Sequence, residues 1–169
     1  MTVDPQQETP RLVRILMTEE AIYGLILISG MIVVSGTTVG TAIDALVTVA
    51  ITVVIFFAAH VYAGTLSRLA ETAGASGLRA SLGAAALQSS GLLAASVVPL
   101  TILVLGTTQA LADDTALWTA LIANTVLLAG LGWVAVARWS SHWTARILGA
   151  LIAACFGGAL TLLKGLVSH

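Results

Sequence analysis

The chain has 169 residues, of which 58% are hydrophobic and 9% are charged, and its mean hydropathy is +1.02. This composition lies far from that of soluble domains and indicates an integral membrane protein, with the lipid bilayer as its main partner. The net charge of −1, without a basic cluster, excludes a nucleic-acid-binding surface, and the single Cys155 excludes an internal disulfide and a cysteine-based metal site.

Five apolar stretches are long enough to cross a bilayer as helices. A hydrocarbon core of about 30 Å requires roughly 20 helical residues, and continuous apolar runs favour helices over barrel strands. We predict an all-α membrane bundle in which residues 1–18 form a cytoplasmic N-terminal segment and residues 19–169 the transmembrane helical domain. The expected spans cover residues 20–35, 41–68, 82–105, 116–137 and 144–167. The polar start is unlike a secretory signal, so we expect the first span to stay in the protein.

The arginines predict the orientation of the spans. They flank the same set of span ends, on one side of the membrane: Arg11, Arg14, Arg68, Arg79, Arg138 and Arg146. The opposite connections, SGTTVGT and TTQALADDT, contain no lysine or arginine. The positive-inside rule then predicts a multi-pass protein of the cell membrane with its N-terminus in the cytoplasm and its C-terminus outside.

A few polar side chains lie at membrane depth, where an ionisable group costs about 2.5–3.5 kcal/mol. We expect Gln88 and Asn124 to form hydrogen bonds between helices, worth about 1 kcal/mol each. His60 is expected to be neutral at rest and bonded to a neighbouring helix. The remaining ionisable residues stand at span ends: Glu19 and Glu20 on the first span and Asp44 on the second.

Two interpretations of Glu19 and Glu20 remain open. Carboxylates in the first turn of a helix are stabilised by its dipole, and Thr18 is suited to cap it, so the pair can simply mark a helix start. Alternatively, the second span ends on the side of the membrane where the first span begins, which places Glu20 and His60 in the same half of the membrane. In that case we expect Glu20 and His60 to form a latch while Glu19 faces an aqueous mouth.

The first span resembles that of a family of lysosomal and bacterial potassium and proton leak channels, which begins with an Arg followed by a Phe-Ser-Asp triplet. Arg14 lies six residues before Glu20, and Thr18, Glu19 and Glu20 occupy the triplet. Five spans are predicted here where bacterial members have six. Four later features follow in the family's order, namely an aromatic, a histidine, a proline suited to a kink and an asparagine: Phe57, His60, Pro99 and Asn124.

The resemblance implies a homo-oligomeric potassium or proton channel, with a tetramer as the expected assembly. In that family the first span lines the pore, and the corresponding aliphatic residues here are Leu25, Ile28 and Ile32, which share one helical face. Such a constriction gates by dewetting. Arg14, Glu19 and Glu20 would form the cytoplasmic mouth, where the carboxylates concentrate monovalent cations.

A non-conducting scaffold or accessory subunit is the alternative, in which faces rich in small residues bind a partner and the carboxylates only cap. A pore requires Leu25, Ile28 and Ile32 to face a symmetry axis, whereas a scaffold can bury them. A membrane enzyme is the least supported class, because no nucleophile elbow, metal motif or cluster of histidines and carboxylates is present. We therefore expect no catalytic residue, metal ligand or cofactor.

Overall fold

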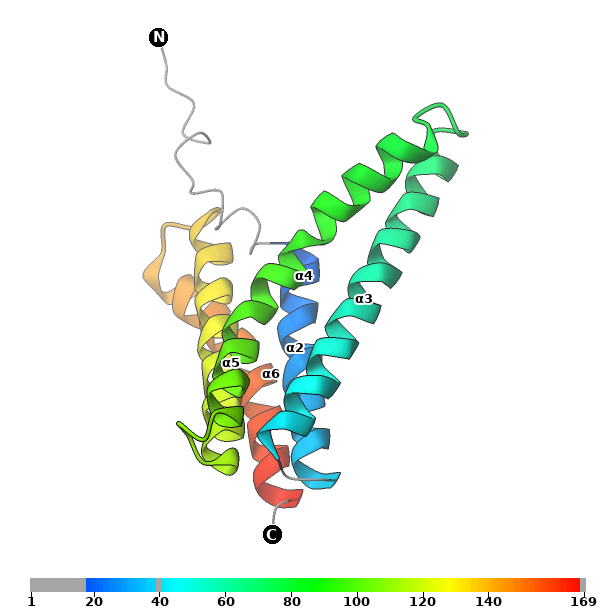
Figure 1. Cartoon of the computed structure of the whole chain (residues 1–169). Coiled ribbons are helices and arrows are strands. Elements are labelled where there is room, and N and C mark those ends of the chain that lie inside the picture. The colour runs from blue at the N-terminus through cyan, green and yellow to red at the C-terminus, as the bar shows by residue number, and fades with distance from the viewer. Residues whose placement is uncertain (1–17, 39–40, 168–169) are drawn as a thin grey trace.

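The computed structural model describes residues 18–38 and 41–167, which form helices joined by short connections (Figure 1). This all-α architecture confirms the predicted fold class. Arg11 and Arg14 of the predicted N-terminal segment lie outside the described residues. Five helices follow one another: α2 (Glu19–Thr38), α3 (Ala42–Glu71), α4 (Leu78–Thr107), α5 (Asp113–Ala137) and α6 (Trp143–Val167).

Four of the described helices have the length and composition of membrane spans. α3, α4, α5 and α6 are each long and apolar enough to cross a bilayer. α2 has 20 residues and is therefore about 30 Å long, which matches the hydrocarbon thickness. Large apolar side chains such as Leu87, Val126 and Leu162 are exposed on the outside of the bundle. The chain is a multi-pass helical membrane protein.

The α3–α4 hairpin is longer than predicted, because both helices continue past the expected span ends. A short turn at residues 72–77 joins them, with positive φ at Ala73, Gly74 and Gly77, and α4 continues through Pro99. Each helix has 30 residues, or about 45 Å, so the pair exceeds the hydrocarbon core by about 15 Å. Figure 1 shows this hairpin projecting beyond the other helices.

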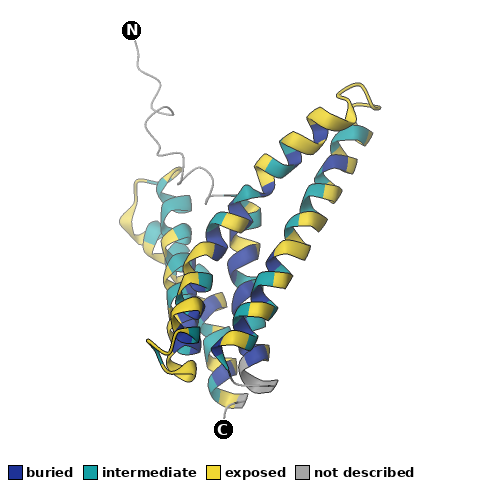
Figure 2. Cartoon of the chain, viewed as in Figure 1, coloured by how far each residue is buried: buried dark blue, intermediate teal, exposed yellow. Residues whose placement is uncertain are grey.

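α2 lies at the centre of the bundle and contacts all four other helices. α3 packs mainly on α4, and α5 on α6, so the chain forms two antiparallel pairs around α2. Buried residues are concentrated along α2 and on the sides of α3, α4 and α5 that face it (Figure 2). Four arginines lie at the end where α2 begins, here called the arginine end: Arg68, Arg79, Arg138 and Arg146.

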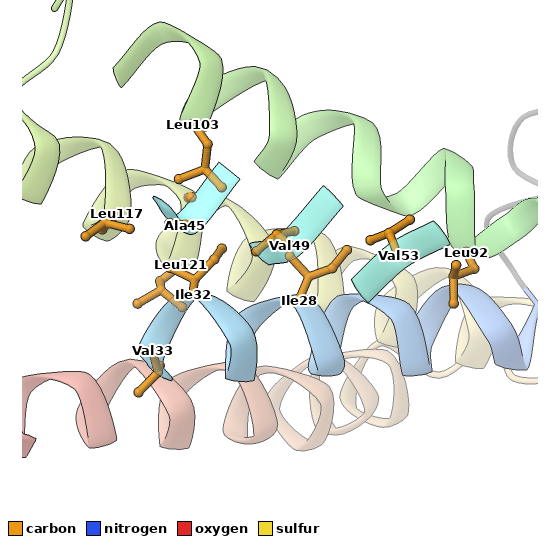
Figure 3. Close-up of a cluster of buried hydrophobic side chains, with 11 residues drawn as sticks. Ile28, Ile32, Val33, Ala45, Val49, Val53, Leu92, Leu103, Leu117 and Leu121 are labelled. Atoms are coloured by element: carbon orange, nitrogen blue, oxygen red, sulfur yellow. The ribbon is translucent and has the colours of Figure 1, made fainter. Parts of the chain in front are cut away.

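Small residues allow the helices to approach closely. A Cβ atom on Gly132 of α5 would lie 2.4 Å from the carbonyl oxygen of Gly149 in α6, so only glycine fits at this crossing. The apolar core comes from four helices (Figure 3), with these side chains: Ile28, Ile32, Val33, Ala45, Val49, Val53, Leu92, Leu103, Leu117, Ala120 and Leu121.

Candidate functional site

Two hydrogen bonds through Gln88 link three helices near the arginine end. Gln88 in α4 donates from Nε2 to Oε1 of Glu20 in α2 at 2.8 Å. Its own Oε1 accepts a hydrogen bond from Nη2 of Arg68 in α3 at 2.7 Å. One N–H group and the carbonyl oxygen of the amide are thus both in use. Gln88 therefore bridges the side chains of Arg68 and Glu20 by hydrogen bonds.

His60 lies near Glu20 and Gln88, but its ring is hydrogen-bonded to its own helix. Its Nδ1 is 2.9 Å from the carbonyl oxygen of Phe56. A carbonyl oxygen only accepts, so Nδ1 of the neutral ring carries the proton and Nε2 keeps a lone pair. The predicted latch between Glu20 and His60 is corrected here, because the hydrogen bond to Glu20 comes from Gln88 of a third helix.

A cavity of about 340 Å³ lies between α2, α3 and α4, and Glu20, His60, Gln88 and Ser89 line it. Ser89 is 3% exposed, whereas the adjacent Ser90 donates a hydrogen bond to the backbone of its own helix at 2.6 Å. The cavity is partly open, and its lining residues belong to the half of the bundle near the arginine end. The rest of its wall consists of small residues: Ala59, Ala63, Gly64 and Ala85.

The aliphatic face of α2 points into the bundle of its own chain. Leu25, Ile28 and Ile32 are each at most 1% exposed. Ile28 and Ile32 belong to the main core (Figure 3), and Leu25 packs in a second cluster with Leu128 of α5. The face predicted to line a pore between subunits is thus covered by the chain's own helices, because α2 is the central helix.

Asn124 of α5 binds α2 at the level of this aliphatic face. Its Nδ2 donates to Oγ of Ser29 at 3.1 Å and lies 3.3 Å from the carbonyl oxygen of Leu25. Asn124 and Ser29 are both buried. The polar group that was expected to join helices therefore holds α2 against α5.

Glu19 and Glu20 are adjacent in sequence but face different hollows, since successive helical residues point about 100° apart. Glu19 is exposed and lines a mainly apolar hollow of about 640 Å³ between α2, α5 and α6. Oγ1 of Thr18 accepts a hydrogen bond from the backbone N–H of Ala21 at 3.3 Å, as in an N-cap. This bond supports the helix-start interpretation, and Arg14, the third residue of the predicted mouth, lies outside the described residues.

An ion pair at the opposite end of the bundle was not found by sequence reasoning. Nζ of Lys164 in α6 donates to Oδ1 of Asp114 in α5 at 2.7 Å and lies 4.5 Å from the ring centre of Trp118. Lys164 is buried, whereas the Asp114 side chain is exposed. Consecutive antiparallel spans place the end of the fifth span beside the start of the fourth. This order alone could have predicted that Lys164 lies near the aspartates of TTQALADDT.

The same end holds a contact between α3 and α5. Oδ1 of Asp113 accepts a hydrogen bond from the backbone N–H of Ala42 at 3.0 Å. Asp44, which was expected at the outer end of the second span, is bonded to the hydroxyl of Thr41, the N-cap of α3. These acidic residues therefore lie in the first turns of helices, where the helix dipole stabilises carboxylates.

Among residues 18–38 and 41–167, no three His, Cys, Asp or Glu side chains lie close enough together to hold a metal ion. No family model matches this chain, and no curated protein or solved structure matches it either. The resemblance to the leak-channel family therefore stays a prediction from the sequence.

Proposed function

We propose that this protein is a non-conducting accessory or scaffold subunit of the cell membrane, which acts by binding a partner. The observation that supports this proposal most is the burial of Leu25, Ile28 and Ile32 inside the chain's own bundle. This burial meets the condition stated above for a scaffold, and it removes from the subunit surface the face that a shared pore would need.

Turning this face outward would carry a large energetic cost. α2 would lose its packing against the four surrounding helices and the hydrogen bond between Asn124 and Ser29. In a bilayer such packing and hydrogen bonds are the main attraction between helices, because lipid is as apolar as the side chains. The cavity lined by Glu20 offers no alternative route, since its lining residues stay in the half near the arginine end.

The projecting α3–α4 hairpin supports a binding role. Its last turns and the connecting residues 72–77 extend beyond the length needed to cross the bilayer. Glu71 and Arg79 are exposed there, with opposite charges on the two helices. A partner at the membrane surface can reach this part of the chain without disturbing the buried core.

Liposomes that contain the full chain test the proposal through potassium and proton flux. We expect liposomes that contain the protein to show the same ion flux as empty liposomes, at every protein density. Ile28→Ala sharpens the test, because shortening a side chain at a constriction would raise the flux of a pore. Val34→Ala, on an exposed part of α2, is the matched control. Flux that grows with protein density and rises further in Ile28→Ala would contradict the proposal.

A further inference from the structure

The cavity between α2, α3 and α4 is lined by acceptor groups from three helices. Glu20 uses one oxygen toward Gln88, and a carboxylate offers about four lone-pair sites in all. His60 retains the lone pair on Nε2, because Nδ1 is engaged with the backbone. Ser89 is buried and lines the cavity, and a serine hydroxyl oxygen can accept hydrogen bonds. The wall therefore has room for several hydrogen bonds from one bound molecule.

The negative charge of the cavity wall favours the binding of a cation. Glu20 is the one lining residue with a formal charge in the described part of the chain, and its partner Gln88 is neutral. Arg68 does not line the cavity and reaches Glu20 through Gln88. Glu20 stands at the start of α2 and is half-buried, and a carboxylate that is partly removed from water is costly unless it is paired. A positively charged guest would supply the contact that the wall lacks.

The size and lining of the cavity select the kind of cation. A bare metal ion is a poor fit, since no three His, Cys, Asp or Glu side chains of the described residues lie close enough together to hold one. The cavity, at about 340 Å³, is also about ten times the share of one water molecule. Its four small apolar wall residues suit a hydrocarbon group. A primary ammonium group has three N–H donors, one for each acceptor residue.

We propose that this cavity binds a primary alkylammonium group, with the ammonium on Glu20, His60 and Ser89 and the alkyl part against the small residues. His60 also lines a second, mainly apolar hollow of about 380 Å³. The ammonium can belong to a free amine or to the headgroup of an aminolipid. The inference does not depend on the proposed function, because the cavity can be filled whether or not the chain conducts.

Calorimetry on the full chain in phosphatidylcholine nanodiscs tests the inference, with n-butylammonium as the probe. Tetramethylammonium is the matched control, because it has the same charge but no N–H donor. We expect saturable binding of butylammonium and at least about tenfold weaker binding of tetramethylammonium and potassium, since hydrogen bonds to charged groups are strong. Addition of phosphatidylethanolamine to the nanodiscs separates the two sources. If this lipid competes with butylammonium, the site binds a lipid headgroup, and if it does not compete, the site binds a free amine.

Three substitutions link the binding to the cavity. Glu20→Gln should weaken butylammonium binding at least about tenfold, and Ser89→Ala about fivefold. Glu19→Gln removes the neighbouring carboxylate, which does not line this cavity, and should leave the affinity unchanged. Thermal unfolding without ligand verifies that each variant is folded. If Glu20→Gln does not fold, Ala63→Leu, which fills the cavity without removing a polar group, takes its place.

Four results would overturn the inference. These are the absence of butylammonium binding to the unaltered chain, equal affinity for tetramethylammonium or potassium, and equal weakening by Glu19→Gln and Glu20→Gln. The fourth is undiminished binding in both Ser89→Ala and Ala63→Leu. None of these results depends on ion flux, so the inference and the proposed function can fail separately.

Discussion

Nδ2 of Asn124 in α5 donates a hydrogen bond to Oγ of Ser29 in α2 at 3.1 Å, in a part of the bundle where both side chains are buried. Ser29 stands beside Ile28 on the central helix, so this bond helps to fix the rotation of α2 that turns Ile28 inward. Hydrogen bonds between membrane helices contribute about 0.6 kcal/mol on average. The rotation of α2 therefore depends on this bond together with the surrounding packing.

A double-mutant cycle on this pair gives the first prediction. Asn124→Ala and Ser29→Ala should each lower the free energy of unfolding, and the pair should show a coupling of about 0.6 kcal/mol. Detergent-induced unfolding of the four proteins measures it. A coupling of zero would mean that the two side chains do not interact in the folded protein.

The second prediction compares two aliphatic positions on α2. Ile28 is 1% exposed and Val34 is 54% exposed. Ile28→Ala should cost about 2–5 kcal/mol because it leaves a cavity in the core. Val34→Ala should change the stability by about 0.5 kcal/mol or less. Unfolding curves of both variants in the same detergent check this, and equal losses would argue against an inward-facing Ile28.

The ion pair at the end opposite the arginines gives the third prediction. Asp114→Ala leaves the buried ammonium of Lys164 without its carboxylate, and we expect a loss of about 2 kcal/mol. Lys164→Met removes the charge but keeps an apolar stem against Trp118, so its loss should be smaller. Thermal unfolding of the two variants decides the order, and the reverse order would show that Lys164 needs no counter-charge.

The fourth prediction concerns orientation. In a Cys155→Ala background, a cysteine at Ala75 lies in the exposed turn at the arginine end, and one at Ala110 lies in the exposed connection at the opposite end. The positive-inside rule predicts that an impermeant maleimide applied outside the cell labels position 110 and spares position 75. Labelling of position 75 from outside would reverse the orientation.

The five helices were predictable because apolar runs of this length have few alternatives in a membrane. Their ends were less predictable at the α3–α4 turn. The polar residues near Arg68 and Leu78 resemble a loop in sequence, yet a turn of six residues with two glycines lets both helices continue. The hairpin therefore projects further than the hydrophobic pattern indicates.

The buried face of α2 was not predictable from periodicity, because most residues between Ala21 and Val34 are apolar and no face is distinguished. Gln88 was recognisable as a polar residue between helices, but its partners Arg68 and Glu20 depend on how α3 and α2 are aligned with α4. Ser89 has an ordinary sequence context and becomes notable through its place in the cavity. The alignment of the helices against one another, which the sequence pattern does not determine, decides which of these residues meet.

Cysteine accessibility at position 28 of α2 tests the central claim most directly. In a Cys155→Ala background in liposomes, Ile28→Cys should not react with a charged, water-soluble methanethiosulfonate, because Ile28 is buried in the chain's own core. With the reagent present on both sides of the liposome membrane, Ala75→Cys in the exposed turn should react fully as the positive control. Rapid modification of position 28 in the folded protein would show that this face lines water, and it would contradict the non-conducting account.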